Sequence, residues 1–429
     1  MESLILRGGH VLDPSQGIDE QVDVVIENGK VADIIPPGRK ARGRDVNVEG
    51  MFVAPGLVDI HVHLREPGYE YKETIETGAN AAVAGGFTSI VAMPNTDPPP
   101  DTAAAVLGFA ARARNAACRV YTVGTITQGR QGQELSEMAD LVAAGVVGFS
   151  DDGAPVSNSR VLLNAMEYAR PLGKAILSHC EVPELAEGGQ MHEGRVSSEL
   201  GIAGMPPIAE SLGISRDIAL AGYSGARLHI CHVSAAASVD VIRSAKMAGS
   251  ARITAETAPH YLALTDEAVR TFDSNAKMNP PLRTRQDQEA LKKALQDGTI
   301  DVIATDHAPH SHEEKQVEFD AAPFGIIGLE TSLGVCWTEL VKTGVLTPMQ
   351  LIEKMSTNPA QVCGLPAGTL KPGTAADVVV IDPDMRWVVA EPFRSRSQNS
   401  PFIGCELQGR AILTIVGGTV RYDVGMLAE

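Results

Sequence analysis

The chain has 429 residues, which is too long for one small domain and suits one large barrel with an accessory domain. Its formal net charge of −17 argues against a general nucleic-acid surface, because such a surface needs a basic footprint. An anionic ligand would therefore need local cationic or metal help to bind. No run of 18 apolar residues occurs, so we expect no membrane span.

The six cysteines are scattered and form no CxxC pair, which favours reduced thiols over a disulfide framework. The first residues, MESLILRGGHVLDPSQG, lack a basic segment followed by a long apolar one, so no signal peptide is expected. Both features predict a cytoplasmic protein.

The first zone of the chain, residues 1–54, contains short β-type runs such as LILRGGHVLD and VDVVIENGKVADII. The Asn28-Gly29 pair between two such runs is typical of a hairpin turn. The last zone, residues 366–429, returns to this style with DVVVIDP and AILTIVGGTVRYD. We interpret the two zones as halves of one small β-sandwich domain, because chain ends often lie close together.

The middle zone, residues 55–365, alternates short apolar runs with Ala-rich stretches of helical character, such as 103–117, 238–249 and 285–298. Eight strands alternating with helices predict an α/β fold, a parallel (β/α)8 TIM-like barrel. A doubly wound open sheet is the alternative, but no GxGxxG follows the first run. The eight runs span residues 56–63, 88–95, 119–126, 145–152, 175–181, 227–234, 252–260 and 301–310.

Polar residues that are costly to bury without a partner lie at the ends of these apolar runs, where the active sites of parallel barrels lie. They are His61, His63, Asp151, Asp152, His179, His232 and Asp306. Residues i and i+2 of a strand point to the same side, so His61 and His63 can reach one ion together. Each histidine alone fits a buried structural role, and Asp306 alone could cap a turn. Together they form the N/O ligand set that zinc prefers.

Four histidines and two of these acids make six protein ligands, which are too many for one tetrahedral ion with an open site and suit two ions bridged by water and a carboxylate. A water shared by two zinc ions can ionise near neutral pH, and a carboxylate beside it can shuttle the proton. Asp306, at the end of the last predicted strand, is the best candidate for that shuttle.

The same residues belong to an ordered series of motifs that resembles the amidohydrolase superfamily, and within it the bacterial type I class of the dihydroorotase family. The resemblance covers nearly the whole chain. The motifs are PGLVDIHVHLREPG (55–68), AMPNTDP (92–98), GFSDDG (148–153), SHCE (178–181), HVS (232–234), ETAPHYL (256–262), KMNPPLR (277–283) and ATDHAPH (304–310).

The resemblance implies two zinc ions per subunit. By motif position, His61 and His63 bind the first ion and His179 and His232 the second. Asp306 binds the first ion and shuttles the proton. One aspartate of GFSDDG bridges the ions, and its spacing to His179 favours Asp152 over Asp151. Neighbouring strand residues face opposite sides, so only one of the two should reach the metals.

The resemblance also implies a substrate site. Arg65, with the planar fork that suits a carboxylate, would bind the substrate together with His63, Asn95 and His310. Asn279 and the backbone at Phe324 and Gly325 would hold a ring amide. The implied reaction is the reversible cyclisation of N-carbamoyl-L-aspartate to dihydroorotate, a step of pyrimidine biosynthesis. A homodimer and a complex with an aspartate transcarbamoylase are family expectations for partners.

Three alternatives remain at this stage. The chain could be a hydantoinase, dihydropyrimidinase or allantoinase, but those usually bridge their metals with a carbamylated lysine on the fourth strand, and GVVGFSDDG has no lysine. It could be an inactive scaffold for the transcarbamoylase, but such chains usually lose metal ligands. Finally, Cys180 or Cys231, next to ligand histidines, could compete for zinc, although strand alternation points them away.

Overall fold

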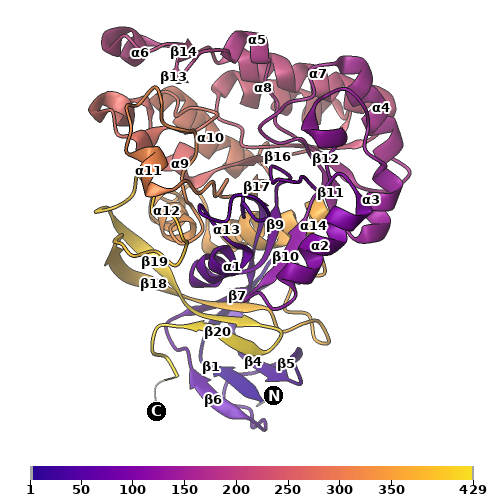
Figure 1. Cartoon of the computed structure of the whole chain (residues 1–429). Coiled ribbons are helices and arrows are strands. Elements are labelled where there is room, and N and C mark those ends of the chain that lie inside the picture. The colour runs from indigo at the N-terminus through magenta and orange to yellow at the C-terminus, as the bar shows by residue number, and fades with distance from the viewer. Residues whose placement is uncertain (1–2, 428–429) are drawn as a thin grey trace.

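A closed parallel barrel forms the larger part of the computed structural model, which describes residues 3–427 (Figure 1). Its eight strands follow one another in chain order, each near the place predicted from an apolar run. They are β8 (Leu57–Val62), β9 (Phe87–Ala92), β10 (Arg119–Thr122), β11 (Gly148–Phe149), β12 (Ala175–Ser178), β15 (Arg227–Ile230), β16 (Arg252–Thr257) and β17 (Val302–Ile303).

The barrel strands pair in two runs, β8 to β10 and β11 to β17, and all these pairs are parallel. Two isolated parallel bridges, Gly124 with Phe149 and Val62 with His307, join the runs and close the ring. Because spatial order follows chain order all the way round, the predicted (β/α)8 barrel is confirmed and the doubly wound alternative is wrong.

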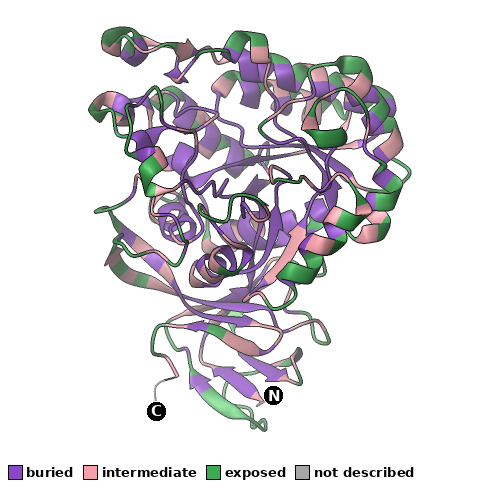
Figure 2. Cartoon of the chain, in the orientation of Figure 1, coloured by how far each residue is buried: buried purple, intermediate pink, exposed green. Residues whose placement is uncertain are grey.

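The barrel is filled by side chains and is no open pore. One core cluster gathers alternate strand residues such as Val58, Ile60, Ala175 and Leu177, and helix α14 (Asn358–Cys363) joins it through Val362. A larger cluster packs the outer faces of the strands against the surrounding helices. Figure 2 shows the result for the barrel: most of the strand residues at its centre are buried, and the outer faces of the surrounding helices carry exposed residues.

The helices have the expected sequence signals at their ends. Helix α10 begins after Thr284, whose hydroxyl accepts from the Asp287 N–H, and it ends at Gly298 with φ 80°. The α-helices are α1 (Ile75–Ala84), α2 (Ala103–Ala113), α3 (Met138–Ala144), α4 (Ser159–Ala169), α5 (Pro183–Ala186), α6 (Arg195–Leu200), α7 (Ile208–Ser224), α8 (Ala236–Ala248), α9 (Pro259–Ala263), α10 (Arg285–Asp297), α11 (His312–Lys315), α12 (Ser332–Cys336), α13 (Pro348–Ile352) and α14 (Asn358–Cys363).

Both ends of the chain build the smaller β part, at the bottom of Figure 1. One sheet has the order β5-β4-β1-β6 and the other β20-β19-β18-β7-β2-β3, so the second combines both termini. Their bounds are β1 (Leu4–Arg7), β2 (His10–Asp13), β3 (Ile18–Gln21), β4 (Asp23–Glu27), β5 (Lys30–Ile35), β6 (Arg44–Asn47), β7 (Phe52–Pro55), β18 (Val378–Val388), β19 (Glu406–Val416) and β20 (Thr419–Asp423); a short pair, β13 (Met191–His192) and β14 (Gly204–Met205), lies in the barrel part.

One apolar cluster lies between these two sheets, with Leu6 and Val24 from the first and Val53, Val380 and Leu413 from the second. This is the sandwich that the sequence predicts. The hairpin at Asn28-Gly29 also forms, with φ of 52° and 78°. The division at 54/55 and 365/366 stays a prediction, although the strands change sheet between Pro55 and Leu57.

The connection between β18 and β19, residues 389–405, leaves the β part and runs to the barrel mouth, where Asn399 contacts His310. Among residues 3–427, no helix has the length and apolar character that crossing a membrane requires.

Candidate metal centre and substrate pocket

The strand ends bring four histidines and two aspartates into one buried group. His61 and His63 lie at the end of β8, and His179 and His232 follow β12 and β15. Asp152 follows β11 and Asp306 follows β17, and all six residues are buried. The residues come from five strands that are distant in sequence, so the barrel closure brings them together.

Asp152 lies in the middle of the four imidazoles. Its Oδ1 atom is 3.5 Å from Nε2 of His61, Nδ1 of His179 and Nε2 of His232. Its Oδ2 atom is 3.5 Å from Nε2 of His63. One oxygen of the carboxylate therefore faces three of the imidazoles, and the other oxygen faces the fourth.

Asp306 closes the group on one side only. Its Oδ1 atom is 3.1 Å from Nε2 of His63 and 3.6 Å from Nε2 of His61. Asp306 thus belongs with the β8 histidines, while His179 and His232 contact Asp152.

The donor atoms fit divalent metal ions better than they fit one another. Spacings of 3.5 Å are too long for good hydrogen bonds, but ligands at 2.0–2.1 Å from a tetrahedral zinc ion are about 3.4 Å apart. Nε2 of His61, Nε2 of His232 and Oδ1 of Asp152 are buried and have no hydrogen-bond partner among the described residues. Such atoms are costly to bury unless something binds them.

Asp151 points away from this group. Its carboxylate accepts from the backbone N–H of Ile126 at 2.8 Å and from the backbone and hydroxyl of Thr127. The neighbouring aspartates therefore face opposite sides, as strand alternation predicts. Asp152 reaches the histidines, and Asp151 ties the end of β11 to residues 126 and 127.

Three residues at the barrel mouth have backbone angles in the left-handed region, which residues other than glycine rarely occupy. The φ angles are 61° at Arg65, 37° at His232 and 49° at Asp306. Strained residues persist only where their surroundings enforce them, and they cluster at functional sites. All three lie where the chain turns out of a barrel strand.

His61 is oriented by a buried chain of hydrogen bonds behind it. Its Nδ1 lies 2.6 Å from Oε1 of Glu256, whose Oε2 lies 3.0 Å from Nε2 of His229. His229 in turn contacts the hydroxyl of Thr254 at 2.8 Å. An Nδ1–H that donates to Glu256 leaves Nε2 of His61 unprotonated and facing Asp152, the tautomer that a metal ligand needs.

Above the histidines lies a pocket of about 230 Å³. Every metal ligand and substrate contact that the resemblance implies lines it except His61, which is fully buried beneath. The lining residues are His63, Arg65, Asn95, Asp152, Gly153, His179, His232, Asn279, Asp306, Ala308, His310, Phe324 and Gly325.

Arg65 supplies the positive charge of this pocket. Its Nε donates to the Pro309 carbonyl at 3.1 Å, and its Nη2 is 3.4 Å from Nε2 of His310. Burial lowers the pKa of Arg65 to about 10, so the guanidinium stays charged at neutral pH. Burial and the Arg65 charge lower the pKa of His310 to about 2, so His310 is neutral.

The other predicted substrate residues also line the pocket, but some already have partners. Nδ1 of His63 donates to Oδ1 of Asn95 at 2.7 Å, which leaves the Asn95 amide group for a ligand. His310 Nε2 donates to the Phe324 carbonyl at 2.9 Å. Asn279 donates to Glu181 at 3.2 Å, and its buried Oδ1 has no partner among the described residues.

Cys180 and Cys231 do not join the histidine group as thiolates. Sγ of Cys180 lies 3.3 Å from Asp217, away from Asp152. Cys231 lies behind His61, beside Glu256. Burial raises the pKa of both thiols, so the neutral form is favoured and metal competition is disfavoured.

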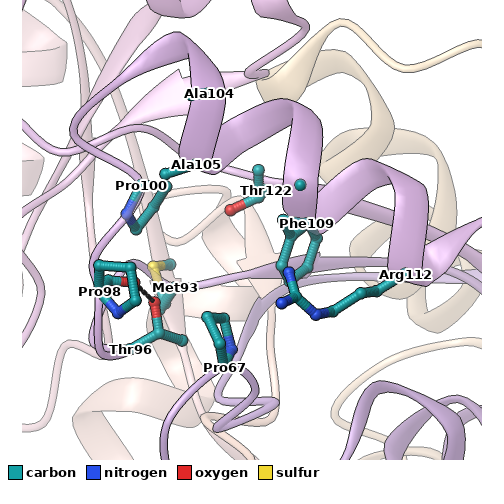
Figure 3. Close-up of a pocket in the computed structure, with 11 residues that line it drawn as sticks. Pro67, Met93, Thr96, Pro98, Pro100, Ala104, Ala105, Phe109, Arg112 and Thr122 are labelled. Carbon is teal, nitrogen blue, oxygen red and sulfur yellow. Dashed lines mark hydrogen bonds between the residues drawn. The ribbon is translucent and has the colours of Figure 1, made fainter.

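A second pocket, shown in Figure 3, opens behind the loop that carries Asn95. Its walls are mostly apolar, with Met93, Pro98 and Phe109, and Arg112 stands at its edge. It contains none of the four histidines or the two aspartates, so it offers no metal chemistry.

Sequence reasoning missed Glu256, His229, Glu181 and Asn399. Glu256 and Glu181 are acids inside the quoted motifs ETAPHYL and SHCE, which was the available signal. His229 lies three residues before His232, within the predicted strand 227–234, and this position was the available signal. Nothing local distinguishes Asn399.

Comparison with known proteins agrees with this geometry. Residues 52–421 match the sequence profile of the Amidohydrolase family. The chain is 51% identical to a dihydroorotase of Pelotomaculum thermopropionicum over 97% of this chain and 98% of the relative. It is also 51% identical to a dihydroorotase of Geobacter metallireducens, over 98% of this chain and 99% of the relative.

Among solved structures, an L-hydantoinase (dihydropyrimidinase) from Arthrobacter aurescens superposes with a TM-score of 0.90 at 28% identity, covering 99% of this chain and 96% of the other. A D-hydantoinase from Thermus sp. superposes with a TM-score of 0.84 at 26% identity, covering 98% of this chain and 96% of the other. The chain therefore belongs to the amidohydrolase family, and within that family to the group of the dihydroorotases.

Proposed function

We propose that the chain is a dihydroorotase, which interconverts N-carbamoyl-L-aspartate and dihydroorotate in pyrimidine biosynthesis. In ring opening, water adds to the ring carbonyl carbon, the carbon–nitrogen bond breaks, and the nitrogen takes a proton; ring closure is the reverse and releases water. The observation that carries the proposal is the placement of Arg65 at one pocket wall above four histidines and two aspartates. The 51% identity to named dihydroorotases supports it.

We infer that two zinc ions bind here. His61, His63 and Asp306 would hold the first, His179 and His232 the second, and Asp152 would bridge the two. The spacing of Asp152 from all four imidazoles supports this assignment. When bound, such a pair of ions supplies a water that ionises near neutral pH and a Lewis acid for the carbonyl oxygen.

Asp306 is the proton carrier in this proposal. Its Oδ1 atom lies 3.1 Å from His63, and its carboxylate also lines the substrate pocket. In ring opening the carboxylate accepts the proton of the attacking water and delivers it to the departing ring nitrogen. The same group works in reverse during cyclisation.

The pocket walls account for substrate recognition. Arg65 would bind the substrate carboxylate with its free guanidinium edge, helped by His63, by the Asn95 amide and by His310. Asn279, whose Oδ1 is unpaired, would accept from a ring N–H, with the backbone at Phe324 and Gly325 beside it. An acidic protein with a formal net charge of −17 can thus bind a dianion through local positive charge.

A hydantoinase-type activity is the second candidate, because hydantoinase structures superpose on the chain. The assay is direct: purified protein with zinc is given dihydroorotate and, separately, hydantoin, and ring opening is followed by absorbance. We expect turnover of dihydroorotate. Turnover of hydantoin but not of dihydroorotate would overturn the proposal.

We further propose a cytoplasmic homodimer that can dock on an aspartate transcarbamoylase. The free cysteines support a reducing compartment, since five of the six are buried thiols. Light scattering of the purified protein would test the dimer. The assay repeated with added transcarbamoylase would test docking, and activity that appears only in the mixture would indicate an obligate complex.

A further inference from the structure

The connection between β18 and β19, residues 389–405, forms part of the catalytic mouth. The strands at its two ends belong to the small β part, yet its middle lies against the barrel loops that follow β17. Asn399 is the centre of that contact and is 4% exposed.

The Asn399 side chain spans two arms of the loop that carries the predicted substrate contacts. Its Oδ1 accepts from the His310 N–H at 3.2 Å. Its Nδ2 donates to the Ala308 carbonyl at 3.3 Å and to the Gly325 carbonyl at 3.1 Å. Its own carbonyl accepts from the Ile327 N–H at 3.0 Å. Both amide hydrogens are therefore used, and all of these partners belong to residues 308–327.

The same connection has a second anchor beside Asp306. The carboxylate of Glu73 accepts from the Ser395 hydroxyl and from the Arg396 N–H, the latter at 3.0 Å. It also accepts from Nε2 of His307 at 3.2 Å. The segment thus holds the chain on both sides of the turn between Asp306 and Gly325.

We propose that Asn399 is a positioning residue for the substrate pocket: it holds His310 and the Phe324-Gly325 backbone at the separation that the substrate needs. The proposal deepens the dihydroorotase function and rests on it for the identity of the substrate. Asn399 contacts none of the histidine group and does not itself line the pocket, but its partners Ala308, His310 and Gly325 do, so it acts through the 308–327 loop.

Two variants test the role, N399A and N399D. Alanine removes all three side-chain bonds. Aspartate keeps the shape of the side chain and the oxygen that accepts from the His310 N–H. It replaces the amide group, which donates to two carbonyls, with an oxygen that can only accept. The control is N358A, which removes a partly buried bond of the same kind, from the Asn358 amide to the Asp301 carbonyl at 2.9 Å, at the opposite end of β17.

Hydrogen exchange of peptides covering residues 308–327 is the direct readout. We expect exchange in both Asn399 variants to rise by about tenfold or more there, since unpaired buried groups loosen the loop. The Michaelis constant for dihydroorotate should rise about tenfold with a smaller change in kcat. N358A should match the wild type in both measurements.

A coupling test separates positioning from general packing. In an H310A background, adding N399A should raise the Michaelis constant by a smaller factor than in the wild type, because one of the two groups that Asn399 positions, the His310 side chain, is gone. Unchanged exchange in 308–327, full additivity with H310A, or loss of the folded state in both Asn399 variants would overturn the proposal. If the wild type fails to open dihydroorotate, the function falls while hydrogen exchange still decides the role of Asn399.

Discussion

Oε1 of Glu256 lies 2.6 Å from Nδ1 of His61, and both side chains are fully buried in the barrel. Partners of this kind fix the tautomer and the ring orientation of a metal-ligating histidine. We expect Glu256→Ala to weaken zinc binding by roughly 10- to 100-fold, measured by competition with a chelator. The control is Glu339→Ala, which removes a carboxylate paired with Lys292 outside the metal centre. Equal zinc affinity in the two variants would show that Glu256 has no such role.

Asp306→Ala should abolish turnover while the protein keeps part of its zinc. Loss of a general acid–base group costs roughly 10²- to 10⁴-fold in rate. His179, His232 and Asp152 remain to hold an ion in this variant. Steady-state kinetics and metal analysis of the same preparation check both statements. An Asp306→Ala protein with wild-type kcat would refute the proton-carrier role.

Arg65→Ala should mainly weaken substrate binding. A charge-assisted hydrogen bond to a carboxylate is worth about 1.5–3 kcal/mol, which corresponds to roughly a ten- to hundredfold higher Michaelis constant. Arg65→Lys should recover only part of the loss, because an ammonium cannot offer the planar fork. If the Michaelis constant stays at the wild-type value in Arg65→Ala, Arg65 does not bind the substrate.

Lys315 predicts a pH dependence of stability. Its Nζ donates to the Ser274 carbonyl at 2.9 Å and to the Pro323 carbonyl at 2.8 Å. Burial and the charge of Lys277 lower the pKa of Lys315 from 10.5 to about 7. Between these two values the unfolded chain holds a proton that the folded chain has released, so the free energy of unfolding rises with pH in that window.

The contribution of Lys315 has a maximal slope of about 1.4 kcal/mol per pH unit. Lys315→Met should remove this pH-dependent contribution. The unfolding free energy of the wild type minus that of the variant should therefore increase between about pH 7 and pH 10. Urea unfolding across this range measures the difference. A constant difference would mean that Lys315 keeps its proton in the folded protein.

Local sequence patterns predict much of this fold because they report local physics. The Asn28-Gly29 hairpin and the capped helix α10 form from residues within a few positions of one another. The site residues at the strand ends are predictable because a histidine such as His179, placed at the end of an apolar run, is costly to bury unless something binds it. Only closure of the barrel, however, decides that Asp152 and not Asp151 faces the histidines.

Long-range contacts explain what could not be predicted. Glu256 and His61 are 195 positions apart, and Asn399 and His310 are 89 positions apart. No periodicity links such residues, since the pairing depends on strand order and on the path of a connection. Strand lengths also differ from the apolar runs: β11 is only Gly148–Phe149, because α3 ends at Gly145 with φ 111° and the chain turns after Ser150.

The central claim is that the four imidazoles and two carboxylates bind divalent ions, and metal analysis of the purified protein tests it most directly. We predict close to two zinc equivalents per chain, loss of activity when a chelator removes them, and recovery when zinc is restored. A protein that holds no divalent ion as purified, and whose activity and stability do not respond to added zinc, would contradict the account.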